Sequence, residues 1–378
     1  MRLTASRLVF VLIAIASSVG MAQVKNPKNI PYNWETDTTQ HTVELGEIKM
    51  VVPRGTFPAI DFPDFIGKKQ GLELFFKHEP VIAVEIDGRA KAYPLNMLTM
   101  HEISNDSLSG IPILPTYCPL CNASIVYDRR VSMAGKELVL NFEVSGMLRN
   151  SDMVMADKQT ESWWQQLTGE AIVGKVTGTR LKVIPSVVIS VEDFFDSYPN
   201  GQILSPETGT TSEARYGTNP YENYDEGSPW LHFIDESQIQ DRLPPMERLI
   251  DIAGTDGHKV YPFSAIKKDG VVNDSYDNQE IVILYKEGTV SVLDEEDITR
   301  SKDIGSATAF YRQVDDKTLT FRKEAGKFRD HQTQSTWDIT GKAIEGPLKG
   351  KKLRPILHSN HFAFAWFAFH PDSEIYEE

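Results

Sequence analysis

Cysteine is scarce in this chain: only Cys118 and Cys121 occur among 378 residues. An intrachain disulfide, a thiol redox pair or a sulfur-ligated metal site must therefore use this one C-x-x-C pair, in the stretch "TYCPLCNASIVYD". The sequence also has no G-x-S-x-G elbow, no glycine-rich phosphate-binding loop and no H-E-x-x-H motif. These absences remove the usual signatures of serine hydrolases, P-loop proteins and zinc metalloproteases.

Basic residues and long apolar runs are also few. The net charge is -14, and lysine and arginine form no run. Because a phosphate backbone is neutralised by a basic face, we expect no nucleic-acid partner. Beyond the N-terminus, the most apolar stretch is "FAFAWFAF", which is far shorter than the roughly 20 residues that a membrane span needs.

The N-terminal residues have the pattern of a secretory signal peptide. Two arginines precede an apolar run, and Gly20 and Ala22 occupy the -3 and -1 positions of a cleavage site before Gln23. We therefore expect residues 1–22 to be removed, leaving a periplasmic or extracellular chain with no membrane span.

Three sequence blocks occur twice in the same order, which indicates an internal duplication. Shared patterns include D-G, Y-P and N-D in one block and D-x-Q-T-x-S-x-W in another. The paired blocks, roughly 170 residues apart, are residues 85–106 and 254–274, residues 157–181 and 330–353, and residues 194–204 and 366–376.

Most segments of each copy read as short strands, since they are β-branched or aromatic and are separated by glycine, proline or Asn-Asp turns. One helix is expected to close each copy, at "SVEDFFDSYP" and at "HFAFAWFAFHP". The predicted fold is mainly β, a β-rich α+β protein of two tandem degenerate units, each with one closing helix. The expected divisions are a signal peptide at 1–22, an N-terminal arm at 23–76, a first unit at 77–204, an inter-unit loop at 205–246 and a second unit at 247–378.

The inter-unit loop is rich in glycine, proline, asparagine and tyrosine in "ETGTTSEARYGTNPYENYDEGSPW". It is either an ordered linker or a lid over a site.

Three interpretations of the cysteine pair remain open. A disulfide is the default in an exported protein, but it would close a loop of two residues and stabilise little. A thiol redox couple usually begins a helix, whereas the residues after Cys121 indicate a turn and a strand. A metal knuckle at the tip of a hairpin fits a C-x-x-C turn followed by Asn122, because asparagine tolerates a left-handed backbone.

Comparison of the two units favours the metal interpretation. The first unit carries His101 and Glu102 in "MHEISND", whereas "KDGVVND" in the second unit has Asp269 and Gly270 at the matching positions. The stretch "IVILYKEGTVSVLD", which matches the cysteine segment, has no cysteine. The joint absence of the histidine and both cysteines predicts that they form one metal site in the first unit.

A histidine and two cysteines suit copper, with zinc as the alternative. Three ligands with an open position are typical of catalytic metals, and the same arrangement suits a metal carrier, so enzyme activity stays open. The fourth ligand would be water or a methionine, for which the sequence offers Met97, Met100, Met147, Met153 and Met155.

The predicted function is metal-dependent redox chemistry or periplasmic metal handling, with a small molecule or a metal-donor protein as partner. One alternative is a metal-free thiol-disulfide oxidoreductase that uses Cys118 and Cys121. The other is a non-catalytic envelope or interaction protein.

A polar stretch between two predicted strands supplies the candidate catalytic residues Asn150, Ser151 and Asp152, because the second unit lacks the Asn-Ser-Asp sequence. Asp152 could orient His101 or act as a general base. The alternative is a turn held by the Asn and Ser side chains.

The set "AYPLNMLTMHEISND", "TYCPLCNASIVYDR", "VSGMLRNSDMVMAD" and "WWQQLTGEAIVG" resembles the prokaryotic family called domain of unknown function 3179. "RYGTNPYENY" is similar to the inter-unit loop of that family, and the resemblance extends from about Phe57 to His370. Asn122 stands where many relatives are expected to have glycine. The resemblance supports the unit boundaries and implies no particular activity.

Overall fold

The computed structural model describes residues 34–210, 213–230, 233–234 and 236–377. Within these residues the chain is mostly strand with five α-helices of seven residues each, which confirms the β-rich α+β fold class. None of the described helices is long and apolar enough to cross a membrane. The predicted signal peptide, residues 1–22, lies outside the described residues.

The N-terminal arm adds short edge strands to three sheets of the first unit. β1 pairs with β11, β2 runs parallel to β6, and β3 pairs with β17. The elements of the arm are the 3-10 helix η2 (Leu45–Glu47), β1 (Lys49–Met50), β2 (Ile60–Asp61), β3 (Phe65–Gly67) and α2 (Lys68–Leu74).

The first unit contains fourteen strands and two helices. They are β4 (Pro80–Ile86), β5 (Arg89–Pro94), α3 (Leu95–His101), β6 (Ser104–Leu108), β7 (Ile111–Cys118), β8 (Ala123–Asp128), β9 (Arg130–Met133), β10 (Lys136–Val139), β11 (Phe142–Arg149), β12 (Asp152–Asp157), β13 (Trp163–Gln165), β14 (Ala171–Val173), β15 (Lys182–Val183), β16 (Ser186–Ser190), α4 (Val191–Ser197) and β17 (Gln202–Leu204).

The second unit repeats this order of strands and helices. Its elements are β18 (Arg248–Ala253), β19 (His258–Pro262), α5 (Phe263–Asp269), β20 (Val271–Tyr276), β21 (Gln279–Lys286), β22 (Ser306–Tyr311), β23 (Gln313–Val314), β24 (Lys317–Thr318), β25 (Phe321–Glu324), β26 (Lys327–Asp330), β27 (Thr336–Trp337), β28 (Ala343–Glu345), β29 (Arg354–Pro355), β30 (Asn360–Phe362), α6 (Ala363–Phe369) and β31 (Glu374–Ile375). Three 3-10 helices lie between the units and one within the second, η3 (Glu213–Arg215), η4 (Tyr224–Glu226), η5 (Glu236–Gln238) and η6 (Ile298–Arg300).

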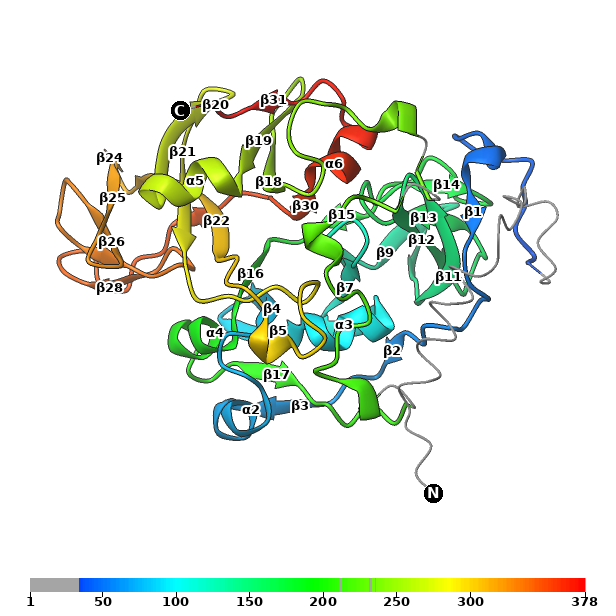
Figure 1. Cartoon of the computed structure of the whole chain (residues 1–378), viewed down its shortest axis with the longest axis horizontal. Coiled ribbons are helices and arrows are strands. Elements are labelled where there is room, and N and C mark those ends of the chain that lie inside the picture. Colours follow the sequence, from blue (N-terminus) through cyan, green and yellow to red (C-terminus); the bar gives the residue numbers. More distant parts are fainter. Residues whose placement is uncertain (1–33, 211–212, 231–232, 235, 378) are drawn as a thin grey trace.

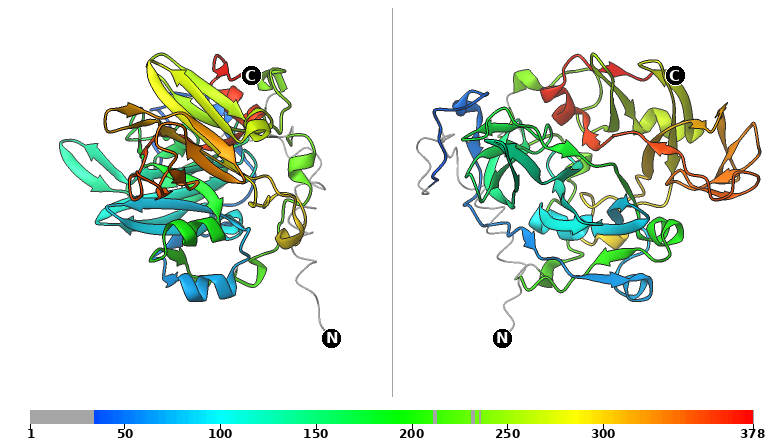
Figure 2. Two further views of the ribbon diagram at one scale, coloured as in Figure 1. Left: turned by 90° about the vertical axis from the view of Figure 1, so that its left-hand side faces the viewer. Right: turned by 180° about the vertical axis from the view of Figure 1, so that it is seen from behind.

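Strand pairing repeats as well. β4 and β5 are antiparallel and β17 adds to β5 in parallel, as β18, β19 and β31 do in the second unit. β11 to β14 form a meander, as do β25 to β28, and these two meanders lie at opposite ends of the molecule (Figures 1 and 2). In each meander an aspartate accepts a hydrogen bond of 3.0 Å from a tryptophan indole, Asp157 from Trp164 and Asp330 from Trp337. The shared D-x-Q-T-x-S-x-W pattern is therefore scaffold.

The two predicted closing helices are present as α4 and α6. Each unit has a second helix that the sequence does not reveal, α3 and α5, directly after the strand that ends at Pro94 or Pro262. Both are only two turns long, too short for a clear helical periodicity. Both end at a left-handed residue, Glu102 in α3 and Gly270 in α5.

Strands of one unit contact strands of the other and so join the two units. β30 of the second unit pairs with β8 of the first at Asn360 and Ser124, within a nine-stranded sheet. β16 of the first unit likewise contacts β22 of the second. The largest hydrophobic core contains residues of both units. The C-x-x-C turn precedes β8 and therefore lies at this junction.

Candidate functional site

The C-x-x-C pair forms the turn of the hairpin β7–β8. Cys118 is the last residue of β7 and is paired with Ala123, the first residue of β8. Asn122 has a φ of 52°, the left-handed conformation that the sequence predicts for a residue after a knuckle. Both cysteines are free thiols, with Cys118 only 1% and Cys121 0% exposed. The strand β8 follows Cys121 almost directly, whereas a thioredoxin-like couple would require a helix to begin at this point.

Asp152 reaches the cysteines from a second hairpin, β11–β12. Asn150 and Ser151 form its two-residue turn with φ values of 51° and 61°, which is the backbone of a type I′ turn. Asp152 directly follows and is completely buried. Its Oδ1 accepts a hydrogen bond of 3.0 Å from the Cys121 thiol.

The second carboxylate oxygen of Asp152 is held by two donors. Oδ2 lies 2.6 Å from Nε2 of Gln165 and 2.9 Å from the backbone nitrogen of Leu167. The ligand atoms of Cys118, Cys121 and Asp152 all lie within 4.8 Å of one another, which makes them the described cluster capable of holding a metal ion. We call these three residues the thiol–carboxylate cluster.

Burial shifts the pKa of all three members of the cluster upward. Burial raises the pKa of Cys118, and burial together with the neighbouring Cys118 and Asp152 raises the pKa of Cys121 well above its usual value. Burial also raises the pKa of Asp152, although the hydrogen bonds that it accepts oppose the shift. Glu102 is a further buried acid close enough to interact electrostatically with Cys118 and Asp152. None of the hydrogen bonds to Asp152 comes from a cationic side chain among the described residues.

His101 is not brought to the cysteines. It ends α3 fully buried, with Nδ1 2.6 Å from the carbonyl oxygen of Pro58 and Nε2 2.6 Å from the Tyr216 hydroxyl. A carbonyl only accepts, so Nδ1 donates to Pro58 and Nε2 accepts from Tyr216. Burial lowers the pKa of His101, in keeping with a neutral ring. The geometry thus assigns to Asp152 the position in the cluster that the sequence assigned to His101.

The other two candidate catalytic residues shape the turn. The backbone nitrogen of Ser151 donates to the carbonyl oxygen of Phe233 at 2.8 Å, and its carbonyl oxygen accepts a weak bond of 3.7 Å from the Cys118 thiol. Its Oγ is buried without a partner among the described residues. Asn150 supplies the first left-handed residue of the turn. Within the described residues, the left-handed backbones of Asn150 and Ser151 therefore form the turn, without the side-chain hydrogen bond from Ser151 that the structural alternative supposed, and only Asp152 joins the cluster.

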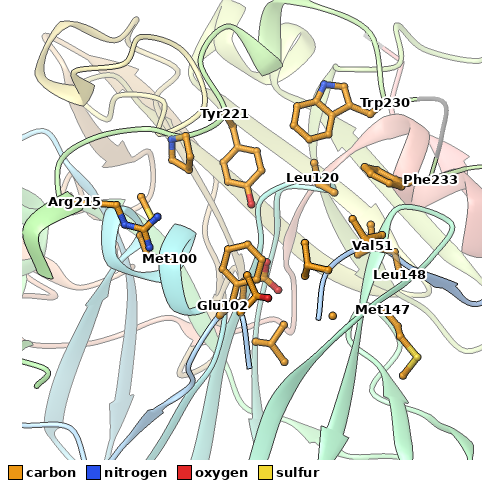
Figure 3. A pocket seen from close by; sticks show the side chains of 16 residues that line it. Val51, Met100, Glu102, Leu120, Met147, Leu148, Arg215, Tyr221, Trp230 and Phe233 are labelled. Carbon is orange, nitrogen blue, oxygen red and sulfur yellow. The ribbon is translucent and has the colours of Figure 1, made fainter. Parts of the chain in front are cut away.

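An apolar cavity of about 170 Å³ reaches the C-x-x-C turn at Leu120, although none of the three residues of the thiol–carboxylate cluster lines it. Its walls come from the arm, from the end of α3, from the C-x-x-C turn, from β11 and from the inter-unit loop (Figure 3). Labelled examples of each are Val51, Glu102, Leu120, Leu148 and Trp230. The inter-unit loop therefore forms part of the cavity wall.

Close approach of the arm requires glycine at one point of this wall. The carbonyl oxygen of Gly146 accepts hydrogen bonds from the backbone nitrogens of Val51 and Val52. Gly146 has a φ of 80°, and a Cβ there would lie 2.2 Å from the carbonyl oxygen of Val52. A side chain at this position would separate the arm from β11.

Sequence reasoning missed Glu102 as a site residue. The sequence did contain an indication of its role. Glu102 stands at the end of α3 in the first unit, whereas glycine, Gly270, stands at the matching position at the end of α5 in the second. Only glycine adopts this left-handed conformation at no steric cost, so a glutamate there indicates a role for its side chain.

Comparison with known proteins decides the family. The model of the family described as Protein of unknown function (DUF3179) matches residues 54–373, most of the chain. The chain belongs to this family. No curated protein and no solved structure matches. DUF3179 membership thus agrees with the resemblance seen in the motifs, and the geometry of the cluster is the evidence for function.

Proposed function

We propose that this DUF3179 protein binds a single metal ion through Cys118, Cys121 and Asp152 and uses it in chemistry on a small molecule. The observation that carries the proposal is the convergence of two thiols and a carboxylate, all fully buried, with ligand atoms within 4.8 Å of one another. Hairpin turns fix both the cysteines and the aspartate, so the ligands are positioned by rigid elements.

A bound cation would resolve the electrostatics of the cluster. Buried acids are costly to ionise without a partner, and here the partners of Asp152 are a thiol, an amide and a backbone N–H. A metal ion ionises coordinating thiols outright and converts such a cost into binding energy. Asp152 is already oriented for this by Gln165 and Leu167, in the manner of outer-shell partners at known metal sites.

Zinc suits two thiolates and one carboxylate, because Zn²⁺ accepts both sulfur and oxygen ligands. Copper, which the sequence favours, is the second candidate, since copper(I) selects soft thiolates and gains less from a carboxylate. Three protein ligands leave one coordination position for water or substrate, as in catalytic zinc sites.

Burial supports chemistry over metal delivery. A carrier passes its ion to a partner protein by ligand exchange, which needs accessible ligands, whereas these cysteines are at most 1% exposed. The adjacent cavity offers space for a small molecule instead. We further propose that the protein is exported, on the basis of its N-terminal sequence pattern.

A thiol redox pair is the second candidate function. The hydrogen bond from Cys121 to Asp152 favours it, because a buried carboxylate could accept the thiol proton. Under this alternative the two sulfurs would cycle between dithiol and disulfide with no metal.

Metal content and thiol state separate these functions. The chain from residue 23 onward, purified under reducing conditions, is offered Zn²⁺ and Cu⁺ separately, desalted and analysed by mass spectrometry for bound metal. One ion per chain, lost in Cys118→Ser and retained in His101→Gln, supports the cluster. His101→Gln is the matched control because glutamine can keep a donor and an acceptor in place of the two ring nitrogens.

Other outcomes would contradict the metal proposal. Equal metal loss in both variants would return His101 to the ligand set. No retained metal, with a Cys118–Cys121 disulfide in protein purified without reductant, would favour the redox pair. No metal and two unreacted thiols would favour the non-catalytic alternative.

A further inference from the structure

Glu102 has three properties that the packing of the surrounding residues does not explain. It is left-handed with a φ of 57°, only 9% exposed, and no described residue forms a hydrogen bond with its carboxyl group. A left-handed non-glycine residue costs about 1–2 kcal/mol. A carboxyl group that is held in a mainly apolar cavity adds a further desolvation penalty. Residues that carry such energetic costs are concentrated at active sites and ligand-binding sites.

The carboxyl group of Glu102 lies in the apolar cavity (Figure 3). Apart from Glu102, Arg215 and Tyr221, the lining carries no acidic, basic or phenolic side chain. The Tyr221 ring points into the same space, with its hydroxyl directed toward the region of Glu102. An apolar cavity with few convergent polar groups is the usual form of a small-molecule site.

The volume of the cavity and the charges of its lining restrict the class of ligand that it can bind. The cavity of about 170 Å³ is close in volume to an engineered cavity of about 150 Å³ that binds benzene. Burial, and secondarily Asp152, raises the pKa of Glu102 to about 8. The walls are mostly apolar, and the two ionisable groups of opposite sign that line them, Glu102 and Arg215, give no excess of one sign that would select a strongly charged ligand.

We propose that this cavity binds a small, uncharged, mainly apolar molecule of roughly one aromatic ring, whose single hydroxyl or N–H group donates a hydrogen bond to Glu102. Tyr221 closes the site from the inter-unit loop and Leu120 from the C-x-x-C turn. The site is built without the metal ligands, so the proposal stands whether or not the cluster binds metal. It would also supply the small molecule on which a metal could act.

The test compares the binding of two probes of seven heavy atoms each, phenol and toluene. Phenol has a hydroxyl group where toluene has a methyl group. Binding to the chain from residue 23 onward is followed by NMR titration, before and after chelator treatment. Phenol is expected to bind about tenfold more tightly than toluene, because a hydrogen bond to a buried group adds this much. Glu102→Leu is expected to abolish the preference, since leucine keeps the bulk and removes both oxygens.

Glu79→Gln is the matched control. Glu79 is also a buried glutamate with its pKa raised to about 8, but it does not line the cavity. It should keep the preference for phenol. Val144→Phe, which places a larger side chain from β11 in the cavity, should weaken the binding of both probes.

Three results would overturn the proposal: equal affinity of the wild-type protein for the two probes, an unchanged preference in Glu102→Leu, or no binding of either probe. A preference that survives chelation while no metal binds would support the ligand site and reject the metal proposal. The two proposals therefore fail separately.

Discussion

The Sγ atom of Cys121 lies 3.0 Å from Oδ1 of Asp152, and this contact joins the turns of two hairpins. Neither hairpin alone brings two thiols and a carboxylate together. The β7–β8 turn supplies two sulfurs and the β11–β12 turn supplies the oxygen.

Asp152→Asn tests the oxygen ligand. The amide keeps the size of the side chain but loses the negative charge, so zinc affinity is expected to fall by at least tenfold to a hundredfold. Competition with a chromophoric chelator measures this change. An affinity equal to that of His101→Gln would show that the carboxylate does not bind the ion.

Glu102→Gly is expected to stabilise the protein by about 1–2 kcal/mol, because it removes left-handed strain and a carboxyl group held in a mainly apolar cavity. The reciprocal change Gly270→Ala should destabilise by about 1 kcal/mol, since Gly270 has a φ of 72°. Urea unfolding measures both values. A destabilised Glu102→Gly variant would mean that the glutamate has a structural partner.

Glu79→Gln is expected to stabilise the protein increasingly as the pH rises. Burial raises the pKa of Glu79 to about 8 against the hydrogen bond from Phe76, and Oε1 has no partner among the described residues. Because the folded pKa is raised, stability present below about pH 4.5 is lost as the pH rises toward 8. The difference between variant and wild type should grow by roughly 2–4 kcal/mol from pH 5 to pH 9.

Unfolding at pH 5, 7 and 9 checks this difference. Glu192→Gln, at an exposed position in the neighbouring helix α4, serves as control and should show no such trend. A constant difference for Glu79→Gln across the three pH values would contradict the expectation.

His370 should make the second unit sensitive to acid. Burial, and then the neighbouring His258, lowers the pKa of His370 to about 4. A histidine with a lowered folded pKa contributes stability above about pH 6.5 that is lost as the pH falls toward 4. His370→Gln is expected to reduce this loss by about 2 kcal/mol. Thermal unfolding from pH 7 to pH 4 measures it, with the exposed His331→Gln as control; identical profiles would refute the assignment.

Much of the scaffold could be predicted from the sequence. Strands and turns followed from local chemistry, as at Asp87-Gly88, whose φ values of 52° and 76° form the tight turn between β4 and β5. The helices α4 and α6 were recognisable because proline follows each within two residues. The duplication was visible because Asp157 and Asp330 hold equivalent tryptophans, which fixes a long motif in both copies.

The candidate site was only partly predictable. Comparison of the copies singled out Cys118, Cys121 and Asp152, whose ligand atoms lie together in the structure, and His101, whose neighbour Glu102 lines the cavity. One residue along the end of a helix changes the direction of a side chain by about 100°. A sequence comparison cannot resolve this difference when the helix itself is too short to recognise.

The second unit has no cysteine, but its backbone helps to hold the cysteine turn in place. Its strand β30 pairs with β8, and the backbone nitrogen of Phe362 donates a hydrogen bond of 2.9 Å to the carbonyl oxygen of Cys121. The thiols therefore belong to one unit, whereas the backbone that keeps them from water belongs to both. Cutting the chain at the unit boundary would not release a smaller working protein; it would uncover the cysteine turn.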